Sequence, residues 1–263
     1  MCGRFVQERS ITELAGVFEA EPLADQLAAG RYNVAPTQPA AVVVQRADGR
    51  RAIVAYDWGL IPHWAPKARI ASRTFNARAE TVATMPAFRD AFRRHRCLVP
   101  ADGFFEWSRR PGVRQPFLIR RVDRRPMAFA GLWASWRDPI TAEPKRTFTI
   151  VTTTANELIE PLHSRMPVVL APEHWAAWLL DPESPDPAGL LGLLTAAPAR
   201  PFELVPVSRL VNDVRNEGPA LIEPAEVSFD FEAGAAEGQP VELSLWPEPT
   251  TQSDALPDRP PPR

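Results

Sequence analysis

The second residue of the chain is a cysteine, and this position gives it chemistry that an internal cysteine lacks. Removal of Met1 would leave Cys2 with a free α-amine beside its thiol, a 1,2-aminothiol. The amine titrates at about pH 8 and the thiol at about 8.5, so both are partly nucleophilic at neutral pH. With an aldehyde, this pair can form a Schiff base and close to a thiazolidine ring. With an ester or amide, the thiol attacks and the amine serves as its base. The alternative is an inert residue at a frayed terminus.

Glu106 is a candidate proton carrier. In the segment Phe104-Phe105-Glu106-Trp107, strand alternation places Glu106 on the face of Phe104 and opposite the other two aromatic residues. Aromatic surroundings would remove water from the carboxyl group and let it exchange protons near neutral pH. The alternative is a glutamate on the solvated face of a sheet.

Two further segments carry candidate catalytic or binding groups. His163 lies in a turn between Pro161 and Pro167, where it could act as acid and base; the alternative is a structural histidine. Asn76 and Arg78 precede an expected helix, so Asn76 either caps that helix or orients a substrate while Arg78 binds a phosphate. The histidines and cysteines lack zinc-type spacing, and no nucleotide-binding glycine motif occurs, so we expect neither metal nor cofactor.

The elements that must position these residues are mostly strands. Ser10 and Glu13 form a capping-box pattern that predicts a helix from Ile11 towards Ala28. Asp48-Gly49 predicts a hairpin turn. Expected strands are Ala40–Gln45, Ala52–Trp58, Cys97–Val99, Phe104–Trp107, Pro116–Arg121, Met127–Trp133 and Thr147–Thr152, and the other expected helices are Ala79–Arg94 in part, Glu173–Leu180 and Ala188–Thr195. This order predicts an α+β domain of mostly antiparallel sheets that close into a barrel-like core with peripheral helices.

Charge is distributed unevenly along the 263 residues. Residues 1–150 carry 24 Lys and Arg against 14 Asp and Glu, whereas residues 151–263 carry 6 against 18. Arginine outnumbers lysine by 28 to 2, and guanidinium groups bind phosphates in pairs of hydrogen bonds, which suits a nucleic-acid backbone; a solvated basic face is the alternative.

From about residue 225 the apolar periodicity fails, so we expect a domain over 2–224 and a disordered, acidic, proline-rich tail over 225–263. No apolar run of membrane-spanning length and no signal peptide is visible, which favours a cytoplasmic, nucleoid-associated protein.

Seven segments in order resemble those of the SRAP family, the proteins first called SOS response-associated peptidases. The segments are Met1–Phe5, Arg31–Thr37, Trp58–Pro62, Asn76–Thr81, Gly103–Trp107, Pro161–Pro167, and Val207-Ser208 with Asn216–Gly218. The resemblance implies a β-rich fold with peripheral helices and a positively charged groove for single-stranded DNA. It also implies that Cys2 crosslinks to the ring-opened aldehyde of an abasic site as a thiazolidine.

The resemblance also implies a role for each matching residue. Asn76 would orient the sugar, Glu106 would manage protons at the Cys2 amine, and His163 would serve as acid and base in sugar ring opening and in slow reversal. The implied DNA contacts are Arg4, Arg78 and Arg165 on phosphates, Trp64 stacked on a base, and Asn33 and Pro36 along the groove. Some members of the family have a second tryptophan where this chain has Ala65.

Three other functions fit the same residues. Class II glutamine amidotransferases also begin with a Met-Cys-Gly type of opening and use the cysteine as nucleophile. A cysteine peptidase could use Cys2, Glu106 and His163, mainly to remove the first residue of its own chain. A reader of modified or damaged DNA could use the groove without covalent chemistry. In the leading hypothesis the partner is single-stranded DNA with abasic sites, and the protein acts as a monomer.

Overall fold

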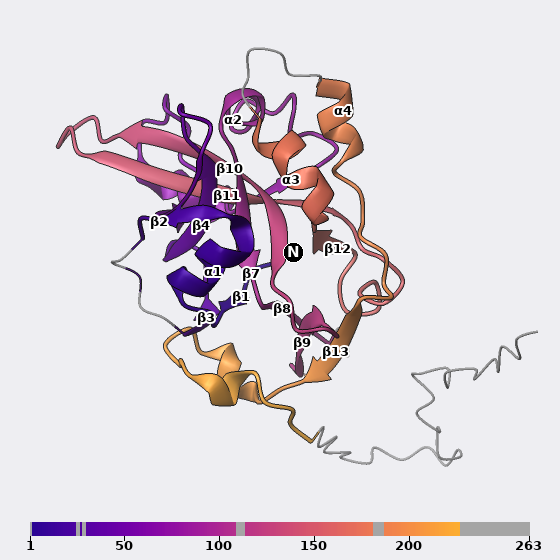
Figure 1. Ribbon diagram of the computed structural model, residues 1–263. Coiled ribbons are helices and arrows are strands. Elements are labelled where there is room, and N and C mark those ends of the chain that lie inside the picture. Colours follow the sequence, from indigo (N-terminus) through magenta and orange to yellow (C-terminus); the bar gives the residue numbers. More distant parts are fainter. Residues whose placement is uncertain (1, 25–26, 28–29, 109–113, 181–186, 227–263) are drawn as a thin grey trace, which may run out of the picture. The chain divides into compact units, whose positions relative to one another are not determined.

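A closed barrel of five strands forms the centre of the fold (Figure 1). The strands are, in order around it, β5 (Arg51–Trp58), β4 (Pro39–Gln45), β7 (Arg96–Ala101), β10 (Met127–Arg137) and β11 (Pro144–Thr154). Neighbouring strands pair antiparallel except at the closure, where β11 pairs with β5 in parallel. The predicted α+β class with a barrel-like core is therefore confirmed. The computed structural model describes residues 2–24, 27, 30–108, 114–180 and 187–226.

Alternation along the barrel strands gives the barrel two apolar faces. On β4, Ala41 and Val43 belong to the core cluster that includes Trp175, whereas Val42 and Val44 belong to the cluster that includes Cys2. Both faces are apolar because one is covered by helices and the other by the N-terminal segment. The burial pattern of β4 therefore has only its two end residues outside the core.

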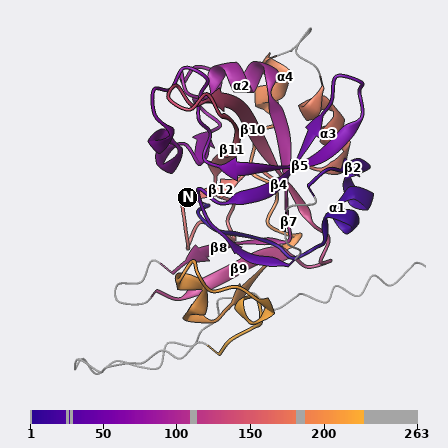
Figure 2. The same cartoon turned by 90° about the vertical axis from the view of Figure 1, so that its left-hand side faces the viewer.

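A second sheet contains the strand that follows Cys2. Its strands are, in order, β13 (Phe202–Pro206), β9 (Pro116–Arg121), β8 (Gly103–Trp107), β1 (Phe5–Gln7) and β3 (Arg31–Val34) (Figure 2). Phe5 pairs with Phe104 on β8 and with Val34 on β3. The first strand of the protein is therefore held between strands that lie about 30 and 100 residues further along the chain.

The helices are shorter than the sequence predicts. The capping box at Ser10 starts α1 (Ile11–Phe18) as expected, but Glu19 adopts a left-handed conformation (φ 51°), and the chain continues as β2 (Ala20–Pro22). The expected helix over 79–94 is reduced to α2 (Arg89–Arg94). The remaining helices are α3 (Pro172–Leu179) and α4 (Pro187–Gly192), near their expected places.

Glycines occupy two turns that need unusual backbone angles. Gly49 closes the predicted β4–β5 hairpin with φ 81°. Gly59 ends β5 with φ 131°, and a Cβ atom on it would lie 2.5 Å from the carbonyl oxygen of Ala71. Its amide donates to the carbonyl of Phe148 on β11, so this turn helps to close the barrel.

Some expectations concern residues outside the described ranges. The acidic tail expected over 225–263 lies there almost entirely, since the description ends at residue 226. Among the helices within the described ranges, none is both long enough and apolar enough to cross a membrane.

Candidate active site

Cys2 is fully buried just before β1, and the side chain of Asn76 binds its backbone. The Nδ2 group of Asn76 donates to the carbonyl oxygen of Cys2 over 2.7 Å. Asn76 begins β6 (Asn76–Arg78), which pairs in parallel with β11 and is not followed directly by a helix. The helix-capping interpretation of Asn76 is therefore wrong, because the next helix begins only at Arg89.

The amide of Asn76 has one atom left for a ligand. Its Oδ1 is buried and accepts no hydrogen bond from any residue within the described ranges. A buried acceptor without a donor costs free energy, and such groups persist where a ligand or a functional group completes them. The acceptor belongs to the same side chain that binds Cys2, so it is placed to accept a hydrogen from an amine or a hydroxyl group at this point.

Glu106 lies on β8 and is only 4% exposed. Its strand neighbours divide as alternation predicts, with Phe104 in the core cluster of Cys2 and Phe105 in a different cluster. The solvated-face alternative for Glu106 is therefore wrong. Because β8 is the pairing partner of β1, this carboxyl group lies close enough to Cys2 to influence its thiol.

The fold strongly affects the ionisation of the Cys2 thiol. Burial raises the pKa of the Cys2 thiol well above its usual range, and the negative charge of Glu106 raises it further. The main cause is desolvation, which penalises a thiolate inside the protein. Burial therefore favours the thiol over the thiolate in the chain that keeps Met1, and the partial ionisation expected after removal of Met1 stays a prediction. Cys97, on β7, is also fully buried, as expected of a small apolar residue.

His163 follows a compact turn that ends just before β12 (Arg165–Pro167). Its ring is half-buried, and its Nδ1 accepts a hydrogen bond of 2.9 Å from the backbone N–H of Arg165. The same Nδ1 lies 3.2 Å from the carbonyl oxygen of Arg165, so the tautomer of the ring decides whether Nδ1 accepts or donates here. The turn therefore presents an imidazole ring that can exchange protons.

Arg165 connects the strands on both sides of β11. Its guanidinium group donates to both carboxylate oxygens of Glu80, over 2.6 and 3.0 Å, and to the carbonyl of Thr152. Thr152 is the register partner of Arg78 on β6. Arg78 is exposed, whereas Arg165 is half-buried. Sequence reasoning missed the role of Glu80, because an ion pair between two residues that are 85 positions apart in the sequence leaves no local signal.

Arg4 and Asn33 join the N-terminal strand to the end of the domain. Nη1 of Arg4 donates to Oδ1 of Asn33 over 2.6 Å and to the carbonyl of Val211 over 2.7 Å. The Nδ2 of Asn33, which is fully buried, donates to the carbonyls of Asp213 and Asn216, each over 3.0 Å. These contacts fix the position of the strand that follows Cys2.

The remaining predicted residues lie in turns at the surface. Pro36 is half-buried in the turn after β3, and Trp64 is 49% exposed in the loop after β5. Ala65, by contrast, is buried, and its carbonyl accepts a hydrogen bond of 2.8 Å from the indole of Trp136. The loop therefore offers one exposed indole at 64, while position 65 faces the protein. Within the described ranges, no group of three or more His, Cys, Asp or Glu side chains is arranged to hold a metal ion.

Comparison with known proteins identifies the family. The family model described as SOS response associated peptidase (SRAP) matches residues 1–214. This chain belongs to the SRAP family. Its relatives include the abasic site processing protein YoqW of Bacillus subtilis, 39% identical over 228 residues that cover 85% of this chain and 99% of YoqW. The abasic site processing protein YedK of Escherichia coli is 33% identical, with coverage of 85% and 100%.

More distant relatives extend the SRAP comparison to animals and to solved structures. The abasic site processing protein HMCES of Gallus gallus is 30% identical over 234 residues, which cover 78% of this chain and 69% of HMCES. A crystal structure of a protein from Bacteroides thetaiotaomicron superposes with a TM-score of 0.77, covering 86% of this chain and all of that one, at 23% identity. The family expected from the seven segments and the expected fold are both confirmed.

Proposed function

We propose that this SRAP protein captures abasic sites in single-stranded DNA covalently, through Cys2. The observation that carries the proposal is the convergence of Asn76 and Glu106 on a fully buried Cys2. The names of the relatives support the same lesion, since several are called abasic site processing proteins. The basic first half of the chain supports a nucleic-acid partner.

The chemistry follows from the free amine that removal of Met1 would give Cys2. The amine condenses with the C1 aldehyde of the ring-opened deoxyribose and releases one water, which leaves an imine. The sulfur then adds to the imine carbon, the thiol proton passes to the nitrogen, and a thiazolidine ring results. Because burial keeps the sulfur as a thiol, sulfur addition needs a base at that step, and the carboxylate of Glu106 is the nearest candidate.

Asn76 and His163 supply the other polar groups in this mechanism. The Nδ2 of Asn76 holds the Cys2 carbonyl, while its free buried Oδ1 accepts a hydrogen from the reacting amine or from a sugar hydroxyl. As an imidazolium, His163 protonates the sugar ring oxygen as the ring opens, and the neutral ring left behind takes a proton in the reverse direction.

The DNA contacts divide into two groups. Arg78 is exposed and binds a backbone phosphate, Arg165 adds positive charge beside it, and the indole of Trp64 stacks on a base. Pro36 lines the groove near the lesion. Nη1 of Arg4 and the side-chain amide of Asn33 form hydrogen bonds inside the protein, so we assign both residues to holding the strand after Cys2.

The family description also favours a peptidase activity directed at the chain's own first residue. Cleavage of the Met1–Cys2 bond would produce the amine that crosslinking needs, and Glu106 and His163 could move the protons. The SRAP match over residues 1–214 favours these two activities over a glutamine amidotransferase. Intact mass of protein made without methionine aminopeptidase tests the self-processing directly, because persistent Met1 would contradict it.

The decisive experiment mixes the purified protein with a single-stranded oligonucleotide that carries one abasic site. Denaturing electrophoresis should show an adduct whose intact mass equals protein lacking Met1 plus oligonucleotide minus one water. An oligonucleotide with a tetrahydrofuran abasic analogue, which has no aldehyde, should give no adduct, and neither should Cys2→Ser. An adduct of equal yield with Cys2→Ser would overturn the proposal, and tight binding without any adduct would favour the noncovalent reader.

A further inference from the structure

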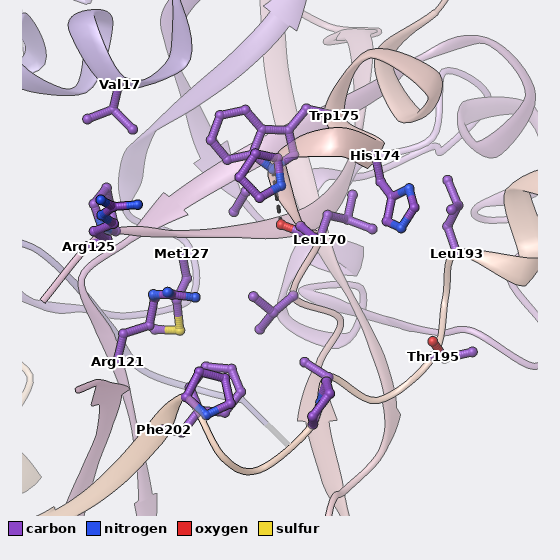
Figure 3. Close-up of a pocket in the computed structure, with 18 of the residues that line it drawn as sticks. Val17, Arg121, Arg125, Met127, Leu170, His174, Trp175, Leu193, Thr195 and Phe202 are labelled. Atoms are coloured by element: carbon purple, nitrogen blue, oxygen red, sulfur yellow. Dashed lines mark hydrogen bonds between the residues drawn. The ribbon is translucent and has the colours of Figure 1, made fainter. Parts of the chain in front are cut away.

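A cavity of about 900 Å³ lies where the start of β10 meets α1, α3 and the chain that follows α4 (Figure 3). Among the described residues that line it, none belongs to the proposed crosslinking or DNA-contact residues. Its volume falls within the range of about 300–1,000 Å³ that is usual for small-molecule sites. The cavity is therefore large enough for an organic ligand and separate from the chemistry of Cys2.

One wall of the cavity is apolar and fixed in place. Met127, Leu170, Trp175 and Phe202 form this wall, and each is nearly fully buried. The ring of Trp175 stacks on Phe18, with centroids 4.6 Å apart, and its indole N–H donates to the carbonyl of Leu170 over 3.0 Å. A ring held by both a stacking partner and a hydrogen bond needs no reordering when a ligand arrives, which favours binding.

The rim of the cavity is positively charged although the whole chain is not. It carries Arg51, Arg121 and Arg125 against a single acidic residue, Glu19, whereas the protein has a formal charge of −2. Arg121 is paired with Asp123 at 2.5 Å, so part of its charge is already compensated. Arg125 is exposed, and its side chain makes no hydrogen bond or ion pair with any residue in the described ranges, although Asp123, which is hydrogen-bonded to Arg121, also interacts electrostatically with Arg125. This guanidinium group is therefore available to an anion.

We propose that this cavity binds a small organic anion, in which an apolar body carries one carboxylate, sulfonate or phosphate group. The apolar body packs against Met127 and Trp175, and the anionic group binds Arg125 beside Arg121. Figure 3 shows the two arginines on one side of the cavity and Thr195 on the other. A ligand of this kind combines burial of apolar surface with a charge-assisted hydrogen bond, so neither half alone should bind as well.

Anilinonaphthalenesulfonate, an aromatic sulfonate that fluoresces when it leaves water, is a suitable probe for the full-length protein. We expect saturable binding of one probe molecule, weakened about tenfold by Arg125→Ala through loss of a charge-assisted bond. Arg124→Ala is the control, since Arg124 is the preceding residue, is exposed, does not line the cavity and pairs with Glu203 over 3.3 Å on another part of the surface. Phenylnaphthylamine, the uncharged analogue, should bind the native protein and Arg125→Ala equally.

A second variant changes the opposite side of the cavity without removing an arginine. Thr195 is exposed, so Thr195→Asp adds a negative charge there with little risk to folding, and it should weaken binding of the sulfonate but not of the uncharged analogue. Equal effects of the Arg125 and Arg124 substitutions would overturn the proposal. So would unsaturable binding, or a Thr195→Asp variant that binds the sulfonate as tightly as the native protein. The crosslinking assay is not used, so failure here leaves the proposed function of Cys2 unaffected.

Discussion

Asn76 offers the sharpest test of the proposed mechanism, because one side chain both holds Cys2 and keeps a buried acceptor free. Asn76→Ala removes the 2.7 Å hydrogen bond and leaves the Cys2 carbonyl without that donor. Loss of a buried hydrogen-bond partner costs about 1–3 kcal/mol. If this energy holds the reacting amine in place, the rate of adduct formation falls about 10- to 100-fold, since 1.4 kcal/mol corresponds to a factor of ten.

The assay separates chemistry from binding and from folding. Adduct formation is followed by denaturing electrophoresis with protein in excess over abasic oligonucleotide, and binding is followed by anisotropy with the tetrahydrofuran analogue. We expect the crosslinking rate to fall while affinity for the analogue stays within about twofold. Thermal unfolding should shift by about 2–12 °C, since 1 kcal/mol corresponds to about 2–4 °C in a domain of this size.

A matched control keeps the type of interaction and changes its place. The side-chain amide of Gln45 donates to the carbonyl of Gly49 over 3.1 Å in the β4–β5 hairpin, so Gln45→Ala removes a similar bond away from Cys2. This variant should crosslink at the native rate. Native-rate crosslinking by a folded Asn76→Ala would refute the reasoning, and so would an equal loss in the Gln45 control.

Three further predictions concern the turn, the DNA surface and the thiol. Gly59→Ala should destabilise the protein by at least about 2 kcal/mol in thermal unfolding, through backbone strain and a close contact. Gly16→Ala, in an open helical position, should instead stabilise it by about 0.5–1 kcal/mol; loss of stability there would contradict the account. Arg78→Ala should reduce the slope of log affinity for DNA against log salt concentration by about one, as expected for the loss of one phosphate contact, and an unchanged slope would remove Arg78 from the interface. Glu106→Gln removes a negative charge that raises the thiol pKa, so Cys2 should ionise at lower pH in thiolate absorbance measured against Cys2→Ser; a shift to higher pH would show that the carboxylate lies elsewhere.

The barrel strands could be predicted because their signal is local. Alternating apolar residues and the Asp48-Gly49 turn define the β4–β5 hairpin, and the structure confirms both strands and the left-handed glycine. The helix expected in part of 79–94 forms only at the end of that range, as α2 (Arg89–Arg94). The residues before it form turns that follow β6, whose partner β11 lies more than 70 residues further along the chain. No pattern within the segment itself reports that pairing.

Some features of the candidate site could likewise be predicted from local sequence, and others could not. Cys2 could be selected by its position in the chain and Glu106 by strand alternation among aromatic residues, and both side chains are buried. The bond between Asn76 and the Cys2 carbonyl could not be predicted, since it depends on where β6 is placed against β11. The raised pKa of the Cys2 thiol could not be predicted either, because the depth of burial is a property of the whole fold.

The bond between Arg4 and the carbonyl of Val211 has a consequence for the order of events during synthesis. The N-terminal strand leaves the ribosome first, but its last partner is made about 200 residues later. At about 5–20 residues per second, that interval lasts about 10–40 s. Contacts with β3 and β8 can form earlier, but the full set of contacts around the N-terminal strand cannot form before Val211 is made. An aminopeptidase that removes Met1 therefore acts while folding around Cys2 is incomplete, and faster translation would shorten the time available to it.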